Sequence, residues 1–558
     1  MTSPLILAIH EDTNANAALL RGNRILAAVA EERLTRTKFQ AGYPRLAVQE
    51  VLRLAGVTLD QVDAVVAGNR FHFLPRVTGR AIEGEHDMFG PQHKAWLSVQ
   101  DRFHTPGPLA QSLEALSSKL LARRFGRSVP LVDHHTAHAY SAYLSSGFPE
   151  CTAITVDNMG DGFSARVFRC RGGRCEPLWG SSAVDSPGEF YGEISQYLGF
   201  RILDAGKVTG LAAHGDPSRA YPVMEKLFRL RRDDTDFQLA WHWPKSKKRG
   251  LFAKLAAFSR EDVSAAAQKR LEDLLLAYVL RALRETGDRH IVLAGGVFAN
   301  VRVNQLLWKQ PAIDGLWVHP GMTDQGIAVG AGLAWVAEHH GAAPHALPHA
   351  YLGTEITEES IGQLLERQRV PHERCDDIDA RVAQLLIQKK VVARVTGRME
   401  YGPRALGHRS ILFHTADPTV NHWLNRRLDR SEFMPFAPAT MVDHAAACYS
   451  DYGPGVAHTA RYMTICLDTT PAMQKASPAV VHIDGTARPQ VVHPEHDPGY
   501  YRIIRHYHEA TGTPTILNTS YNIHGEPIAC TAADALDIFQ RKEVDCLALG
   551  PFLLQRGG

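Results

Sequence analysis

Short apolar runs of strand length alternate with helical segments along most of this chain. The first three runs, Leu5–His10, 17–20 and 25–29, are separated by short polar turns, and this spacing predicts β-hairpins. His290–Ala294 is almost wholly apolar and ends in two glycines, which is typical of a strand buried on both faces. The pattern therefore predicts an α/β fold with covered sheets.

The other expected elements continue this alternation. Helices are expected at residues 44–55, 325–339, 378–389, 419–428 and 532–540, and strands at 62–67, 152–156, 317–319 and 391–395. A strand near Leu131 leads into a helix through His138, and a further strand ends at Leu517. We see no tandem repeat and no low-complexity tract.

The length of 558 residues is too great for one hydrophobic core, so two or more domains are expected. Residues 341–353 are rich in Gly, Pro and Ala and form the best linker candidate. The predicted domains are residues 1–348 and 349–558.

The composition argues against several classes of function. The formal net charge is +2, and the densest basic patch, residues 245–249, is expected to be a solvated loop rather than a nucleic-acid track. No window reaches the ~18 apolar residues that span a bilayer, and the N-terminus lacks a secretory signal. The eight cysteines form no Cys-x-x-Cys pair, which favours free thiols and a cytoplasmic protein.

The run His134-His135-Thr136-Ala137-His138 is the first candidate for chemistry. On a helix, His134 and His138 are four residues apart and share one face, so both imidazoles can reach one metal ion. On these residues alone, a metal site and a plain polar surface are about equally expected. Asp324, in a turn between a short strand and a helix, is the candidate third ligand.

Glycine-and-acid turns follow two of the expected strands. One turn contains Asp157, Gly160 and Asp161, and the other contains Gly295 and Gly296, with Asn300 and Asn304 further on. Glycines let a backbone approach phosphates, and Asn and Asp hold a ribose or a metal. Each turn alone is a weak signal, but their order after an N-terminal hairpin resembles the fold of actin-like ATPases and sugar kinases.

The second half contains an arginine-rich loop, Glu400 to Ser410, which includes Arg404, His408 and Arg409. Arg430, Arg488 and the run Asn518-Thr519-Ser520-Tyr521-Asn522 lie downstream. The planar guanidinium donates two hydrogen bonds at once, which suits phosphate. Surface salt bridges are the usual role of a single arginine, but arginines in a Gly-Pro loop are more often binding residues.

These motifs resemble one family over nearly the whole chain. GRMEYGPRALGHRS, EFMPFAP, DGTARPQ and LNTSYNIHGEPI in the second half, and HHTAHA, AGKVTGLAAHG and LAGGVFAN in the first, look like the signature segments of the O-carbamoyltransferases of antibiotic and nodulation-factor biosynthesis. The nearest branch carbamoylates aminoglycosides, ansamycins, aminocoumarins and macrolides.

The resemblance implies a fold and a division of labour. The first domain would have the actin-like ATPase fold of the tRNA threonylcarbamoyl-transferase subunit, and the second would be a YrdC-like α/β domain. The second would form carbamoyl-adenylate from carbamoyl phosphate and ATP, with Mg2+ accompanying the ATP. The first would transfer the carbamoyl group to a hydroxyl of a small natural product, using a divalent metal, expected to be Fe2+, on His134, His138 and Asp324. The adenylate would pass between the domains shielded from water.

The resemblance also implies the site residues. The catalytic residues would be His10, Asp12, Arg404 and Ser520. The residues that bind the nucleotide or carbamoyl phosphate would be Asp157, Gly160, Asp161, Lys207, Gly295, Gly296, Asn300, Asn304, Arg404, His408, Arg409, Arg430, Met463, Arg488, Asn518, Ser520 and Asn522.

The chain departs from its relatives at two positions. Thr13 and Asn14 stand where many relatives have a His-Asp pair, so His10 becomes the expected general base or acceptor-orienting group. Asp429 stands where many relatives have a lysine, and Arg427 or Arg430 would supply that charge.

Three rival interpretations are open. A tRNA threonylcarbamoyl-type enzyme would need a broad basic face, which a net charge of +2 does not favour. A sugar kinase would leave the arginine-rich motifs unused, and a binding module would release no pyrophosphate. We expect ATP, carbamoyl phosphate and a hydroxyl acceptor, a sugar hydroxyl by our hypothesis, as partners, with no nucleic acid and no membrane. A homodimer is one arrangement open to the chain.

Overall fold

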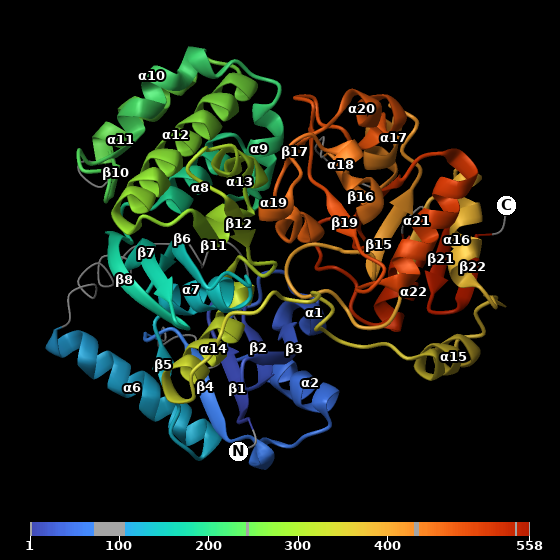
Figure 1. The fold of residues 1–558 in the computed structure, drawn as a ribbon, viewed down its shortest axis with the longest axis horizontal. Helices are drawn as coiled ribbons and strands as arrows, with labels where there is room; N and C mark the ends of the chain where they lie inside the picture. Colours follow the sequence, from blue (N-terminus) through green and yellow to red (C-terminus); the bar gives the residue numbers. More distant parts are fainter. Residues whose placement is uncertain (1–2, 72–106, 241–244, 429–434, 542–543, 557–558) are drawn as a thin grey trace. The chain divides into compact units, whose positions relative to one another are not determined.

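The computed structural model describes residues 3–71, 107–240, 245–428, 435–541 and 544–556 (Figure 1). These residues form two compact units. The first unit comprises Met1–Glu31 and Phe39–Leu347, and the second comprises Glu32–Lys38 and Pro348–Gly558. The main division, after Leu347, lies inside the expected linker, whereas the assignment of Glu32–Lys38 to the second unit has no counterpart in the sequence pattern.

The first unit contains a mixed sheet in the order β3-β2-β1-β4-β5. Its strands are β1 (Leu5–His10), β2 (Asn16–Arg21), β3 (Arg24–Ala30), β4 (Ala64–Gly68) and β5 (Leu131–Val132). β1, β2 and β3 pair antiparallel, and β4 and β5 continue the sheet in parallel with β1. The predicted hairpins are therefore confirmed, and β1 is buried along its whole length.

A second sheet of the same unit repeats this arrangement in the order β12-β11-β6-β7-β8. Its strands are β6 (Glu150–Gly160), β7 (Phe163–Arg171), β8 (Arg174–Ser182), β11 (His290–Ala294) and β12 (Gly315–Val318). Three antiparallel strands are again followed by two parallel ones. This duplicated strand order is that of the actin-like ATPase fold, which confirms the expectation for the first half; the duplication lies in topology and not in visible sequence repeats.

Two helices pack against each other and against these sheets (Figure 1). α14 (Ile327–His339) covers β1, β2 and β4, and α7 (His134–Leu144) covers β6 and β11. Gly330 on α14 permits their close approach, because a Cβ atom there would lie 1.8 Å from the carbonyl oxygen of Ala137. Asp133 caps α7 by accepting a hydrogen bond from the Thr136 amide. The histidine-bearing helix is thus fixed in place at its first turn.

The remaining helices of the first unit are α1 (Glu31–Thr35), α2 (Arg45–Ala55), α6 (Pro108–Phe125), α8 (Pro187–Tyr197), α9 (Gly206–Ala212), α10 (Pro217–Leu227), α11 (Lys245–Leu255), α12 (Arg260–Thr286) and α13 (Val301–Trp308), with α1 extending into the second unit. Lys245 to Arg249 begin α11, so the expectation of a loop there is wrong. Among the described residues, no helix combines the length and the apolar character needed to cross a bilayer.

The second unit is built on a larger mixed sheet in the order β13-β22-β21-β14-β15-β20-β16-β19. Its strands are β13 (Glu373–Arg374), β14 (Val392–Val395), β15 (Arg409–Phe413), β16 (Ala437–Met441), β19 (Gln490–Val492), β20 (Thr515–Ser520), β21 (Cys546–Leu549) and β22 (Phe552–Gln555). This mixed sheet confirms an α/β second domain, and its YrdC-like identity stays a prediction.

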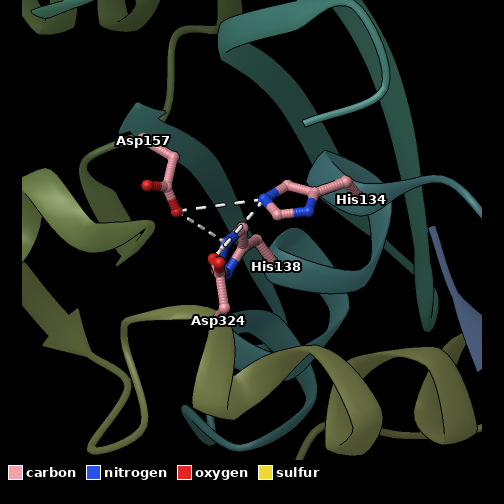
Figure 2. A group of neighbouring side chains, drawn as sticks. All are labelled: His134, His138, Asp157 and Asp324. Atoms are coloured by element: carbon pink, nitrogen blue, oxygen red, sulfur yellow. Dashed lines mark hydrogen bonds and ion pairs between the residues drawn. The ribbon is translucent and has the colours of Figure 1, made fainter. Parts of the chain in front are cut away.

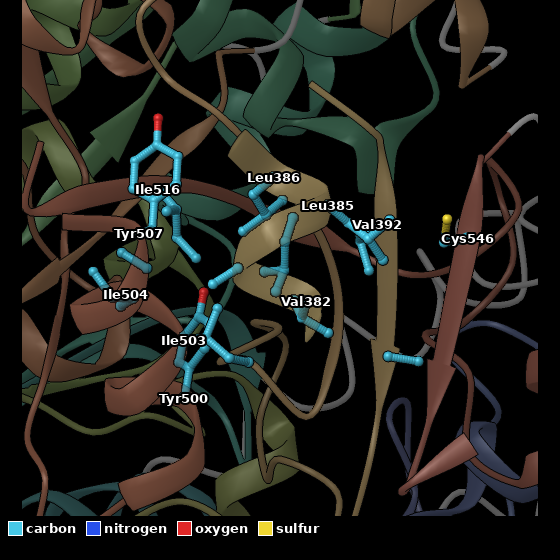
Figure 3. Close-up of a cluster of buried hydrophobic side chains, with 14 of the residues drawn as sticks. Val382, Leu385, Leu386, Val392, Tyr500, Ile503, Ile504, Tyr507, Ile516 and Cys546 are labelled. Atoms are coloured by element: carbon cyan, nitrogen blue, oxygen red, sulfur yellow. The ribbon is translucent and has the colours of Figure 1, made fainter. Parts of the chain in front are cut away.

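The core of this unit lies between the sheet and two helices, α16 (Ile378–Ile387) and α21 (Pro498–Thr511) (Figure 3). Val382 and Leu386 of α16 and Ile503 of α21 belong to the same buried cluster as Ile516 of β20. The expected helix 378–389 and strand 391–395 are therefore confirmed within two residues. This packing holds the ends of β14, β15 and β20, where the arginine-rich loop and the Ser520 segment begin.

Candidate functional site

Four side chains of the first unit converge in a possible metal site: His134, His138, Asp157 and Asp324 (Figure 2). The two histidines come from the first turns of α7, Asp157 from β6, and Asp324 from the turn η4 (Asp324–Gly326). His138 Nε2 lies 3.1 Å from Asp157 Oδ2 and 3.6 Å from Asp324 Oδ1. His134 Nε2 lies 3.9 Å and 3.7 Å from the same two oxygens. One ligand atom from each residue lies within 4.8 Å of all the others.

The burial and chemistry of this group fit a divalent cation. His134 and His138 are 2% and 0% exposed, and Nε2 of His134 is a buried atom. Burial raises the pKa of Asp157, but the hydrogen bonds and charges of His134 and His138 more than offset this and bring the pKa well below its ordinary value. Two imidazoles and two carboxylates are a donor set that iron, manganese and zinc accept.

Asp161 is a structural support for this group rather than a member of it. Its carboxylate accepts hydrogen bonds from the backbone amides of Arg70, Phe71 and His134 at 2.8, 3.2 and 2.8 Å. Burial and the nearby Asp133 raise the pKa of Asp161 to about 6. Gly160 lies against the metal group itself, because a Cβ atom there would lie 2.1 Å from the His134 ring. Both residues are expected nucleotide ligands, and both contact His134.

His10 lies beside the metal group at the end of β1. Its ring centroid is 6.3 Å from that of His134, its Nε2 is 3.2 Å from the carbonyl oxygen of Thr13, and it is fully buried. Asp12 accepts a hydrogen bond from the Thr13 amide at 2.6 Å and so shapes the same loop. The fold therefore brings the expected base close to the metal ligands, with Asp12 in the loop between β1 and β2.

The glycine-rich turns meet at Asp157, whose Oδ2 accepts a hydrogen bond from the Gly296 amide at 3.1 Å. Gly295 precedes this amide, with a φ of +101°. Asn300 exchanges hydrogen bonds with Gln268 of α12 at 2.8 and 3.2 Å. Asn304 is fully buried and donates to the Phe298 carbonyl. The turns thus reach the metal group through Asp157.

Lys207, on α9, forms an ion pair with Asp204 at 3.6 Å and lies over the Phe200 ring. Thr209 lies two residues further along the same helix, and its hydroxyl accepts a hydrogen bond of 3.4 Å from Asn300. This contact connects α9 to the second glycine turn.

In the second unit, Arg404 and Arg488 lie close enough that Arg488 lowers the pKa of Arg404, although burial is the larger cause. Burial also lowers the pKa of Arg488. The Nε atoms of both side chains are buried. Two partly buried guanidinium groups in proximity form a site that suits a dianion.

The Ser520 segment is attached to the arginine-rich loop through β15 and β20. Ser410 pairs with Ser520 across these strands, and Asn518 donates to the Ala405 carbonyl and to Gln490 Oε1 at 3.2 and 2.8 Å. Ser520 Oγ donates to Asn522 Oδ1 at 2.6 Å. Two signature segments that are more than a hundred residues apart are therefore in direct contact.

Met463 is 2% exposed and adopts a left-handed backbone with φ of 55°, which is uncommon for a residue other than glycine. This backbone conformation ends the 3-10 turn Thr459–Tyr462. Its expected role in binding the nucleotide or carbamoyl phosphate stays a prediction.

Arg409 and His408 have their polar atoms engaged within the protein. Arg409 is fully buried and donates to the carbonyls of residues 354, 396, 397, 408 and 530. His408 Nε2 lies 3.2 Å from Asp497 Oδ2, and its ring stacks on Tyr351 at 3.8 Å. A phosphate at Arg409 would have to displace those carbonyls. Their arrangement is typical of residues that hold a loop in shape.

Arg430 and Asp429 lie outside the described residues. Sequence reasoning missed Asp157 as a member of the metal group, because the turn after β6 reads equally well as a nucleotide loop. It also gave no sign that three further side chains would hydrogen-bond the predicted site residues His134, Asn300 and Asn518, because no motif contains them. These side chains are Asn69, Gln268 and Gln490.

Comparison with known families covers most of the chain. The family model described as "Carbamoyltransferase N-terminus" matches residues 6–333, and "Carbamoyltransferase C-terminus" matches residues 383–556. Nodulation protein NolNO of Sinorhizobium fredii is 31% identical, over 97% of this chain and 78% of that protein. The uncharacterized protein MJ1051 of Methanocaldococcus jannaschii is 30% identical, over 99% of this chain and 100% of that protein.

Solved structures give only distant likenesses. HypF from T. kodakarensis is 13% identical with a TM-score of 0.38, covering 61% of this chain and 49% of that chain. A ROK family glucokinase from Streptomyces griseus is 13% identical with a TM-score of 0.29, covering 59% of this chain and 99% of that chain. The fold assignment therefore rests on the strand order. The two family matches, which together span both units, show that the chain belongs to the carbamoyltransferase family and is a carbamoyltransferase.

Proposed function

We propose that this enzyme is an ATP-dependent O-carbamoyltransferase that acts on a hydroxyl of a small natural product. The observation that carries the proposal is the pair of guanidinium groups of Arg404 and Arg488, partly buried in the second unit. Two like charges in a desolvated place are unfavourable unless an anion joins them. Carbamoyl phosphate and the phosphates of ATP are anions of the required kind.

In the second unit, carbamoyl phosphate would react with water to give carbamate and inorganic phosphate. A carbamate oxygen would then attack the α-phosphorus of ATP, forming carbamoyl-adenylate as pyrophosphate leaves with its Mg2+. Arg404 and Arg488 would neutralise the phosphate charge, and Ser520 and Asn522 would orient the substrate through their hydroxyl and amide. The contact between Asn518 and the Ala405 carbonyl supports this grouping.

In the first unit, an acceptor hydroxyl would attack the carbamoyl carbon, and AMP would leave. His10 would take the proton of the hydroxyl, and its position 6.3 Å from the His134 ring supports that role. His134, His138, Asp157 and Asp324 would hold the divalent cation, for which we propose Fe2+. When bound, that ion supplies Lewis-acid polarisation of a carbonyl.

We propose a sugar hydroxyl of an antibiotic-like metabolite as the acceptor. Membership of the carbamoyltransferase family and the similarity to a nodulation protein support a small-molecule acceptor. Mass spectrometry of glycosylated antibiotics incubated with the enzyme would detect the gain of one carbamoyl group.

Two variants separate the two half-reactions. Arg404→Ala is expected to stop pyrophosphate release in the presence of ATP and carbamoyl phosphate. His138→Asn is expected to leave pyrophosphate release intact and to stop carbamoylation of the acceptor. Loss of pyrophosphate release in a folded His138→Asn protein would contradict the two-site scheme, and so would a wild-type protein that releases none with Fe2+ and Mg2+ present.

A further inference from the structure

We infer that Asn69 is a positioning residue that directs the metal-binding nitrogen of His134 into the metal group. The inference rests on the proposed metal function, and it adds a residue that is not itself one of the proposed metal ligands. Asn69 immediately follows β4, on the first sheet, whereas Asp157 belongs to the second sheet. The side chain thus connects the two duplicated halves of the first unit at His134.

The contact is a single buried hydrogen bond. His134 Nδ1 lies 2.9 Å from Asn69 Oδ1, and the two residues are 2% and 5% exposed. An amide oxygen only accepts hydrogen bonds, so Nδ1 must carry the proton and donate it. In a neutral imidazole the other nitrogen, Nε2, then has the free lone pair. That is the atom which lies 3.7 Å from Asp324 and 3.9 Å from Asp157.

The backbone of Asn69 adopts an unfavourable conformation at the point where its side chain contacts His134. Its φ is +82°, in the left-handed region that residues other than glycine seldom adopt. Such a conformation is unfavourable and persists where the surroundings impose it. Here the backbone amide of Asn69 donates a hydrogen bond to the Val132 carbonyl at 2.8 Å.

Asp161 connects the same strained segment to His134. Its carboxylate accepts from the amides of Arg70 and Phe71, which follow Asn69, and from the amide of His134. One carboxylate therefore holds both the backbone that follows Asn69 and the backbone of the metal ligand His134. A side chain at position 69 that presents an acceptor to Nδ1 has little freedom to turn elsewhere.

The substitution Asn69→Gly tests this role, because glycine suits the left-handed backbone while it removes the amide. Binding of Co2+ to the metal-free protein would be measured by its ligand-field absorption and by competition with a chelator. All proteins would carry His493→Ala, because His493, Glu495 and His496 form a second group of possible ligands. We expect Asn69→Gly to weaken Co2+ binding by about 10- to 100-fold, the usual effect of losing a hydrogen-bond partner of a metal-bound histidine.

Two comparison variants separate orientation from a general loss of structure. Asn69→Asp keeps an acceptor for Nδ1 and is expected to retain Co2+ affinity within a few-fold. Lys389→Gly places glycine at another left-handed position, with φ of 59°, in the second unit, and is expected to leave Co2+ affinity unchanged. The melting temperature of each metal-free protein would be recorded alongside.

The outcomes distinguish this inference from the function on which it rests. Equal Co2+ affinity in the wild type and Asn69→Gly would overturn the role of Asn69 and leave the metal site standing. Equal weakening by Asn69→Gly and Asn69→Asp, in proteins that remain folded, would also overturn it. A wild-type metal group that binds no Co2+, as judged by identical spectra for the wild type and His134→Ala, would sink the proposed metal function together with the inference.

Discussion

In the first unit, the carboxylates of Asp157 and Asp324 surround two imidazoles, whereas in the second unit the guanidinium of Arg404 lies near that of Arg488. Both groups are largely removed from water, where an uncompensated charge is costly. The first group contains donors for a cation, and the second contains donors for an anion. The difference teaches that the two units offer donor groups for ligands of opposite charge, so we expect the first to respond to a cation and the second to an anion.

The largest expected effect concerns the carboxylate that sequence reasoning assigned to nucleotide binding. Asp157→Asn should weaken Co2+ binding by more than ~100-fold, because it removes a charged oxygen from a set of four donors. Calorimetric titration of the metal-free proteins with Co2+ would measure the loss of affinity. Asp161→Asn is the matched control, because the carboxylate of Asp161 accepts hydrogen bonds from backbone amides and is not a proposed metal ligand. This variant should weaken Co2+ binding less than Asp157→Asn does. Equal losses would mean that Asp157 acts only through structure.

A second prediction separates two arginines of one loop. Arg409→Lys should lower the free energy of unfolding of the second unit by about 3 kcal/mol, because one ammonium cannot replace a guanidinium that reaches five carbonyls. Arg404→Lys should change that free energy by less than ~1 kcal/mol. Urea unfolding followed by circular dichroism would compare them. An equal loss from both variants would erase the distinction between a loop-holding and a ligand-binding arginine.

Glu11 is a buried carboxyl group whose pKa is shifted upward, whereas the pKa of Asp157 is shifted downward. Burial raises its pKa to about 7, and Arg124, 3.0 Å away, only partly offsets this. Between pH ~4.5 and ~7 the folded state retains a proton that the unfolded state releases, so stability should fall by up to about 3 kcal/mol as pH rises and then level off. Glu11→Gln copies the protonated form and should flatten this slope.

The measurement is urea unfolding of both proteins at pH 5 and pH 8. The control is Asp60→Asn, at an exposed position whose folded-state pKa is lowered mainly by a hydrogen bond with Thr58. A wild-type slope that survives in Glu11→Gln would show that another group carries it.

The smallest expected effect is on anion binding in the second unit. Arg488→Gln should weaken binding of inorganic phosphate by about tenfold, close to 1.4 kcal/mol, and should leave the protein without phosphate as stable as before or more stable, because the repulsion with Arg404 is lost. Thermal shift measurements with and without phosphate would test both parts. A less stable ligand-free protein with unchanged phosphate affinity would assign Arg488 to structure instead.

Local patterns predicted much of the fold. Leu5–His10 and His290–Ala294 are strands with the expected bounds, because a continuous apolar run can only be buried. The same reasoning mistook Lys245 to Arg249 for a loop, since a basic sequence carries no apolar periodicity. It also gave no sign of Glu32–Lys38 as part of the second unit, where Arg36 donates to the Pro527 and Ile528 carbonyls.

The candidate site was predictable to a lesser degree. His134 and His138 share a helix face by simple spacing, and both lie in the metal group. Asp157 and Arg409 were read by residue type, which does not reveal whether a side chain faces a cation, an anion or backbone carbonyls. That choice depends on neighbours that are distant in sequence.

The sequence by itself determined the chemical content of this protein: the family motifs, the histidine pair and the arginine-rich loop are legible as residue types at fixed spacings. Only the tertiary structure decided which of these residues meet. The pairing of β15 with β20 brings Ser410 opposite Ser520, and packing of α7 in the first unit places His134 between Asn69 and Asp324. The physical reason is that burial and hydrogen bonding act through space, so the charge and tautomer of each side chain are set by partners that chain order does not specify.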